Sequence, residues 1–146
     1  MKIKPTPLKD CYIIEPTVFE DERGYFYEKF NEKKFEELTG LNGHFVQDNV
    51  SKSSYGVLRG LHLQKGEHAQ ANLVSCLEGS VFDVAVDLRK DSPTFGKWFG
   101  IELSAENKLQ FYSAFDFIET NDIVYHFMFT LQQKGIMHED ALIHLY

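Results

Sequence analysis

An alternating β pattern fills residues 71–88, ANLVSCLEGSVFDVAVDL. In a strand, successive side chains point to opposite faces. The second half therefore has one apolar face (82, 84, 86, 88) and one face that includes two acids (81, 83, 85, 87). The turn signal Glu78-Gly79-Ser80 lies between the two β-rich runs and predicts a hairpin of residues 71–77 and 81–88.

Similar β signals occupy residues 12–19, 25–28, 45–51, 57–64, 97–103, 109–112 and 123–131. The clear helix signal covers residues 31–39, with Asn31 as the N-cap and Gly40 just beyond the end. Many short strands without a βαβ rhythm predict an all-β sandwich or barrel. The length of 146 residues fits a single domain, 1–146.

One strand carries two candidate site residues with a glycine between them. Strict alternation would place Arg59 and His62 on opposite faces. We therefore expect Gly60 to mark a bulge or bend if both residues serve one site.

Composition restricts the classes of partner. The net charge of −7 argues against nucleic acid or an anionic membrane as the main partner, so an anionic ligand needs a local cationic cluster. Two cysteines do not form a disulfide framework and are expected to be free thiols in a reducing cytoplasm. No apolar run is long enough to span a membrane, and no signal peptide is evident, so we expect a soluble, cytoplasmic protein.

Several side chains suggest chemistry, each with a plainer alternative. His62 is a candidate general base or a hydrogen-bonded core histidine. Asp83 is expected to pair with a histidine or arginine if it is buried, whereas Asp87 is expected to cap the strand end in solvent. The Gln47-Asp48-Asn49 run can bind a base or sugar, or form an ordinary loop.

Arg23 and Glu28 flank two aromatic residues, and they suit either phosphate binding beside a stacking face or a surface ion pair. Metal-binding motifs are absent, because neither a His-x-His pair nor a His-Glu-x-x-His helix occurs. His62, Glu67 and His68 leave a metal site as a minor alternative.

Four motifs in order resemble the dTDP-4-dehydrorhamnose 3,5-epimerase family: RGYFYE (23–28), FVQDN (45–49), GVLRGLH (56–62) and VFDVAVDLRKDSPTFGK (81–97). The resemblance extends from about residue 8 to Tyr112. It implies a cupin-type jelly-roll barrel with one short helix, a homodimer, and an enzyme without metal or cofactor. It also implies a dTDP-sugar substrate, dTDP-4-keto-6-deoxyglucose, which is epimerised at C3 and C5 to dTDP-4-keto-L-rhamnose in rhamnose biosynthesis.

The resemblance also assigns roles. His62 matches the family's general base and Tyr125 its acid on the opposite face of the sugar, and we add Asp83 as the buried carboxyl of the catalytic group. The substrate-binding positions are Arg23, Phe26, Glu28, Gln47, Asn49, Arg59 and Asn72.

The chain departs from the family in two places. Asn72 and Ser75 stand where the family usually has lysine and arginine. From about residue 113 the sequence is atypical, and the family's Gly-Phe-Ala-His-Gly-Phe segment is missing, for which a deletion, frameshift or truncation would account. The alternatives to an active 3,5-epimerase are therefore a catalytically impaired nucleotide-sugar-binding cupin or a related deoxysugar epimerase or ketoisomerase. A metal-dependent cupin oxygenase or lyase is the least favoured class.

Overall fold

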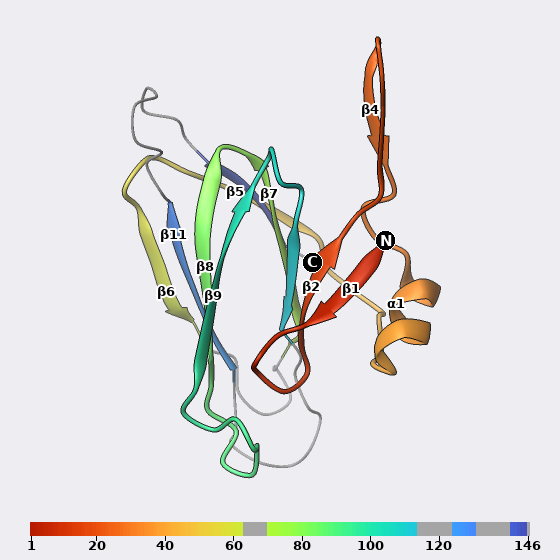
Figure 1. The fold of residues 1–146 in the computed structure, drawn as a ribbon. Coiled ribbons are helices and arrows are strands. Elements are labelled where there is room, and N and C mark those ends of the chain that lie inside the picture. Colours follow the sequence, from red (N-terminus) through yellow and green to blue (C-terminus); the bar gives the residue numbers. More distant parts are fainter. Residues whose placement is uncertain (63–69, 114–123, 131–140, 146) are drawn as a thin grey trace.

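The computed structural model describes residues 1–62, 70–113, 124–130 and 141–145, without the side chains of 61, 62, 124–130, 141 and 142. Within these residues the chain forms two antiparallel sheets that face each other, a separate β-hairpin and one short helix (Figure 1). This arrangement confirms the expected all-β fold.

The larger sheet has six strands in the order β1 (Lys2–Pro5), β2 (Cys11–Glu15), β10 (Gln110–Ser113), β7 (Asn72–Glu78), β12 (Ala141–Leu145) and β5 (Asn49–Ser53). The smaller sheet has four strands in the order β6 (Leu58–His62), β11 (Val124–Thr130), β8 (Ser80–Asp87) and β9 (Trp98–Ser104). The β-rich run predicted at 45–51 forms a strand only from Asn49 onward.

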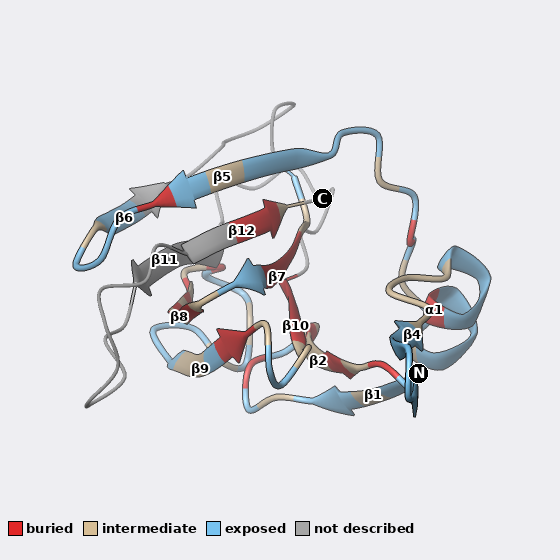
Figure 2. Ribbon diagram, turned by 90° about the horizontal axis from the view of Figure 1, so that it is seen from above, coloured by how far each residue is buried: buried red, intermediate tan, exposed pale blue. Residues whose placement is uncertain are grey.

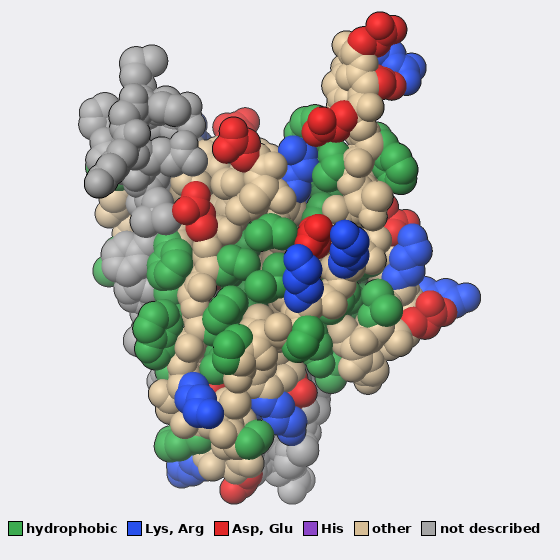
Figure 3. All heavy atoms as spheres, viewed as in Figure 1, with side chains coloured by type: hydrophobic (Ala, Val, Ile, Leu, Met, Phe, Trp, Pro, Cys, Tyr) green, Lys and Arg blue, Asp and Glu red, His purple; other side chains and the backbone are tan. Residues whose placement is uncertain are grey.

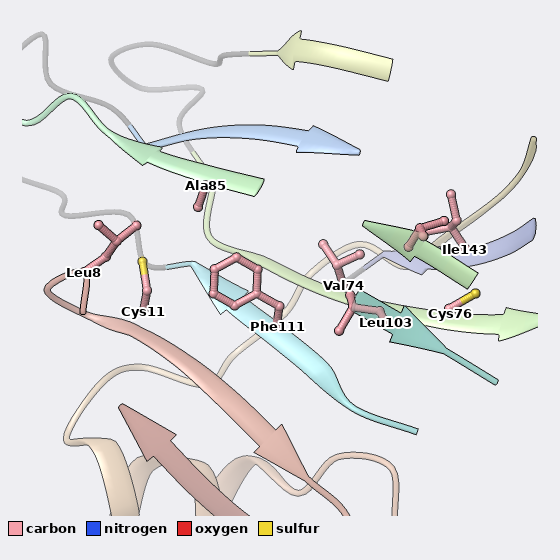
Figure 4. Close-up of a cluster of buried hydrophobic side chains, with 9 residues drawn as sticks. Leu8, Cys11, Val74, Cys76, Ala85, Leu103, Phe111 and Ile143 are labelled. Atoms are coloured by element: carbon pink, nitrogen blue, oxygen red, sulfur yellow. The ribbon is translucent and has the colours of Figure 1, made fainter. Parts of the chain in front are cut away.

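The main core lies between the two sheets (Figure 4). Val74, Phe111 and Ile143 from the larger sheet pack with Val81 and Ala85 from the smaller one. These residues identify the inner face of each sheet. Because side chains alternate along a strand, the residues at every second position from them share the inner face, and the residues between lie on the outer face.

Helix α1 (Glu32–Thr39) covers the outer face of the larger sheet together with residues before and after it. The Asn31 side chain accepts a hydrogen bond from the Lys34 amide at 3.0 Å, and Gly40 adopts φ = 72°. Both predicted helix ends are therefore confirmed. Phe35 is fully buried against Leu73 and Tyr112, which anchors the helix to the sheet.

The predicted hairpin of residues 71–88 is wrong in its pairing. β7 pairs with β10 and β12, whereas β8 pairs with β9 and β11. The turn at Gly79 (φ = 69°) therefore carries the chain from one sheet to the other. Strand pairing partners are chosen by the packing of the whole sandwich, which a local turn signal does not encode.

Asp87 is fully buried, so its predicted solvent exposure is also wrong. It accepts hydrogen bonds from Arg89 Nε at 3.0 Å and Nη2 at 2.9 Å, from Ser92 Oγ at 2.6 Å and from Thr94 Oγ1 at 2.5 Å. Arg89 also donates to Asp10 and to the Lys9 carbonyl. This network fastens the loop after β8 to the turn before β2.

The hairpin of β3 (Val18–Asp21) and β4 (Gly24–Tyr27) stands clear of the two sheets (Figure 1). Phe19 and Phe26 face each other across it and are 64% and 70% exposed. Among the helices that the structure describes, none is long and apolar enough to cross a membrane.

Candidate functional site

The strand β6 contains a bulge at the predicted position. His62 pairs with His126 and Arg59 pairs with Met128, so three steps along β6 match two steps along β11. Gly60 lies within this irregularity and adopts φ = 136°, which L side chains rarely adopt. The expectation for Gly60 is confirmed.

The bulge puts Arg59 and His62 on the same face of the sheet. His126 of β11 pairs with His62 on one side and with Ala85 on the other, and Met128 pairs in the same way with Arg59 and Asp83. Residues paired across a sheet share a face, so His62 shares the face of Ala85 and Arg59 shares the face of Asp83. Ala85 belongs to the core between the sheets, so both positions are on the inner face.

Asp83 lies on the same inner face and is fully buried. Burial raises the pKa of its carboxyl well above 3.8, although a hydrogen bond from the Val84 amide acts in the opposite direction. A buried carboxyl whose pKa is raised in this way is a group that can take part in proton transfer.

The larger sheet contributes polar residues to the inner face opposite. Asn49 and Ser53 of β5 share the face of Ile143, and Asn72 of β7 shares the face of Val74. Arg59 crosses between the sheets: its Nε donates to Ser53 Oγ at 2.8 Å, and its Nη2 donates to the Lys52 carbonyl at 3.1 Å. The guanidinium is thus held between β6 and β5.

Gln47 joins this group from the segment before β5. Its Nε2 donates to Asn49 Oδ1 at 3.1 Å, and both residues are exposed. Figure 2 shows that β5 and the segment preceding it form an exposed margin of the larger sheet. An open margin with amides and a guanidinium can bind a polar, anionic ligand.

The remaining predicted binding residues lie elsewhere. Arg23 is at the tip of the projecting hairpin, where it forms an ion pair with Asp21, and acidic and basic side chains gather there in Figure 3. Phe26 lies on the same hairpin. Glu28 accepts hydrogen bonds from Lys34 Nζ at 2.7 Å and Asn31 Nδ2 at 3.0 Å. Arg23 and Glu28 are therefore each in an ion pair, but with different partners.

Tyr125 and His62 differ in register position within the four-stranded sheet. Its backbone pairs with Val86, the neighbour of Ala85, so its register position lies on the outer face. The predicted acid and the predicted base therefore occupy opposite faces of the four-stranded sheet.

Metal ligands do not gather anywhere among the described side chains: no group of three His, Cys, Asp or Glu there could hold an ion. Glu67 and His68 of the minor metal alternative lie outside the described residues. The atypical sequence from about residue 113 is described only at Ser113, 124–130 and 141–145.

Sequence reasoning missed two features of the site. Ser53 orients Arg59, but a serine in a β-rich run gives no signal of that contact. His144 contacts both Lys29 and Asp48. These contacts link β12 to two segments that are far away in the sequence. Of these three residues, the sequence singles out only Asp48, as the middle residue of a polar run.

Most of the chain is similar to proteins of one known family. Residues 5–120 match the family model of dTDP-4-dehydrorhamnose 3,5-epimerase. The enzyme of that name from Shigella flexneri is 49% identical over 155 residues, which cover 99% of this chain and 86% of the relative. The matched part spans only 60% of the relatives from Salmonella typhimurium and Escherichia coli.

Two solved structures are also similar. The dTDP-4-dehydrorhamnose 3,5-epimerase of Elizabethkingia anophelis has a TM-score of 0.86 and 70% identity, covering 99% of this chain and 72% of its own. The dTDP-6-deoxy-D-glucose-3,5-epimerase of Legionella pneumophila, solved with dTDP-4-keto-L-rhamnose, has a TM-score of 0.82 and 44% identity, covering 99% and 69%. These neighbours confirm the expected cupin-type jelly roll.

Proposed function

The chain belongs to the dTDP-4-dehydrorhamnose 3,5-epimerase family, and from that premise we propose that it acts on dTDP-4-keto-6-deoxyglucose. The reaction inverts C3 and C5 and gives dTDP-4-keto-L-rhamnose. The observation that supports this most directly is the inner-face group of Arg59, His62 and Asp83, faced by Asn49 and Asn72.

The chemistry follows from the ketone at C4 of the sugar. Loss of a proton from C3 or C5 is eased because the negative charge delocalises onto this carbonyl as an enolate. A neutral imidazole suits the removal of such a proton near neutral pH, and we assign this role to His62. The enolate oxygen needs hydrogen-bond donors, for which Asn72 offers a neutral amide where the family usually has lysine.

Nucleotide binding is assigned to the cationic and amide groups of the open margin. Arg59 provides a bidentate fork for the diphosphate, and its contact with Ser53 orients that fork. Gln47 and Asn49 provide donors and acceptors for the sugar or base. In a chain of net charge −7, this local placement of arginine is what an anionic ligand requires.

Inversion also needs an acid on the opposite side of the sugar from the base. Tyr125 is our candidate for this role from the family resemblance, but its outer-face register position counts against it. This observation favours a second candidate function, a protein that binds the nucleotide sugar and is impaired in inversion.

The experiment that separates these functions incubates the substrate in deuterated water and follows C3 and C5 by NMR. Exchange with inversion is expected of a complete epimerase. Exchange without inversion is expected of a base acting alone, because His62 then returns deuterium to the face from which it removed the proton. A His62→Ala variant is the control. Exchange no faster than this control, together with no dTDP binding by calorimetry, would contradict both functions.

We also propose a homodimer in which the projecting hairpin completes the partner's site. Arg23 and Phe26 stand on this hairpin, away from the inner-face group of their own chain (Figure 1). The hairpin exposes Phe19 and Phe26, and β5 at the sheet margin exposes Val50, so a second copy would cover apolar surface on both.

A cytoplasmic location is proposed with the same function. Cys11 and Cys76 are both buried and neither forms a disulfide, which fits a reducing compartment. Burial raises the pKa of the Cys76 thiol to about 11, so this side chain is unreactive near neutral pH.

A further inference from the structure

A polar cluster lies on the outer face of the larger sheet, behind the candidate site. His144 of β12 is in the row of Ser75 and Gln110, and Gln110 pairs in turn with Ile14 of the outer-face core. Its imidazole contacts Lys29 on one side and Asp48 on the other. Neither contact is part of the inner-face group described above.

The chemistry of the three groups sets the direction of the hydrogen bonds. Asp48 is an acceptor, so His144 Nε2–H donates to its Oδ1 at 2.5 Å. The other ring nitrogen, Nδ1, is then an acceptor, and it accepts a hydrogen bond from the Lys29 ammonium. Burial lowers the pKa of Lys29 to about 8, while Asp48 acts in the opposite direction. The cluster is thus a chain of hydrogen bonds from Lys29 through the His144 imidazole to the Asp48 side chain.

The cluster fixes two segments that bear proposed binding residues. Asp48 lies between Gln47 and Asn49, and Lys29 directly follows Glu28. Lys29 is also held by its backbone, because Gln110 Nε2 donates to its carbonyl at 2.5 Å. Lys29 is therefore tied to β10 and β12, and Asp48 is tied to β12, all within the larger sheet.

The short segment Gln47-Asp48-Asn49 links the outer-face contact to the inner face. Asn49 lies on the inner face of the larger sheet, at its margin, and the Gln47 side chain is hydrogen-bonded to the Asn49 side chain. Holding Asp48 against His144 fixes the backbone between Gln47 and Asn49, whose side chains are hydrogen-bonded to each other. The Asp48 side chain is 57% exposed, whereas that of His144 is 10% exposed, so the imidazole is the fixed member of the pair.

We propose that Lys29, His144 and Asp48 are positioning residues for nucleotide-sugar binding, because they orient Gln47 and Asn49 toward the ligand. This inference rests on the proposed function. Its consequence is a loss of ligand affinity when the Asp48–His144 contact is removed, with the rate of the bound complex largely preserved.

The test compares Asp48→Ala and Asp48→Asn with the wild-type chain. Asp48→Ala is expected to raise the dTDP dissociation constant and the substrate KM about ten-fold, which corresponds to one charge-assisted hydrogen bond. The rate of exchange at saturating substrate should change less than about two-fold. Asp48→Asn keeps an acceptor oxygen for His144 and should recover most of the affinity. Asp91→Ala, at an exposed acid of a remote loop, is the matched control.

His144→Phe and Lys29→Met provide a second route if Asp48→Ala folds poorly. Near-UV circular dichroism establishes folding, and the side-chain amide NMR signals of Gln47 and Asn49 should shift in each variant. Wild-type affinity in a folded Asp48→Ala would overturn the proposal, as would an Asp48→Asn variant no better than Asp48→Ala. If the wild-type chain itself binds no dTDP, the proposed function is what fails.

Discussion

Asp83 belongs to the candidate catalytic group, and its burial is expected to lower the stability of the fold at neutral pH. Its carboxyl is fully buried, and burial raises its pKa well above 3.8. The folded state therefore holds this proton more tightly than the unfolded chain does. The contribution of Asp83 to stability is greatest in acid and is lost as the pH rises from 3.8 toward the raised pKa.

An Asp83→Asn substitution tests this conflict. We expect the free energy of unfolding at pH 7 to increase by about 1 kcal/mol, because the amide has no charged form to bury. The advantage should grow with pH above 4 and vanish at pH 3. Deuterium exchange at C3 and C5 should fall. Urea unfolding across this pH range provides the measurement, and a less stable variant at pH 7 would show that the buried carboxylate is well compensated.

Asp87 differs from Asp83 although both lie on the buried face of β8. Burial alone would raise its pKa, but hydrogen bonds from Arg89, Ser92 and Thr94 outweigh it and hold the pKa well below 3.8. Its contribution to stability is therefore present above that pH and is lost as the pH falls below it.

We expect Arg89→Met to lower the free energy of unfolding at pH 7 by about 3–5 kcal/mol, because it leaves the Asp87 charge buried without its guanidinium. The difference from wild type should shrink as the pH falls below 3.8, because Asp87 is then protonated in the unfolded chain and in the folded variant, which lacks the guanidinium. Lys90→Met, at the exposed neighbouring position, is the matched control. Urea unfolding at pH 7 and pH 3 measures both effects, and an equal loss in the two variants would contradict the assigned role.

At the scale of the element, the bulge in β6 is what brings Arg59 and His62 to one face. A Gly60→Ala substitution places a Cβ on a backbone with φ = 136° and should cost about 1–3 kcal/mol of stability. Any relaxation of the bulge moves His62 relative to Arg59, so exchange should fall further than stability alone explains.

Gly96→Ala is the control for that variant. Gly96 also has a positive φ, 75°, with open space around its missing Cβ, but it lies in the loop after β8. Both variants should lose stability in urea unfolding. A Gly60→Ala variant that retains the exchange activity of Gly96→Ala would show that the bulge does not align the site.

The elements also show where sequence reasoning succeeds. The α1 helix and the Gly60 bulge were predicted because their causes are local: an Asn cap, a terminal glycine and a break in alternation. The pairing of β7 and the burial of Asp87 were mispredicted because both depend on partners distant in the chain. Alternation separates the two faces of β8, but it does not say which one meets the other sheet.

At the scale of the whole molecule, the binding residues divide into two groups that one chain does not bring together. One group lies around Arg59 and the inner face, and the other, with Arg23 and Phe26, stands on the projecting hairpin. If the hairpin of one copy completes the site of another, two defective chains can restore each other.

Mixing His62→Ala with Arg23→Ala therefore tests the assembly. Each variant alone should show little deuterium exchange. After unfolding and refolding together, half of the dimers are mixed, and one of the two sites in each mixed dimer has both His62 and Arg23 intact. Exchange should then recover to about a quarter of the wild-type rate at equal total protein. A site built within one chain would give no recovery, because every site would still lack one of the two residues, and light scattering of the wild-type chain would show whether a dimer forms at all.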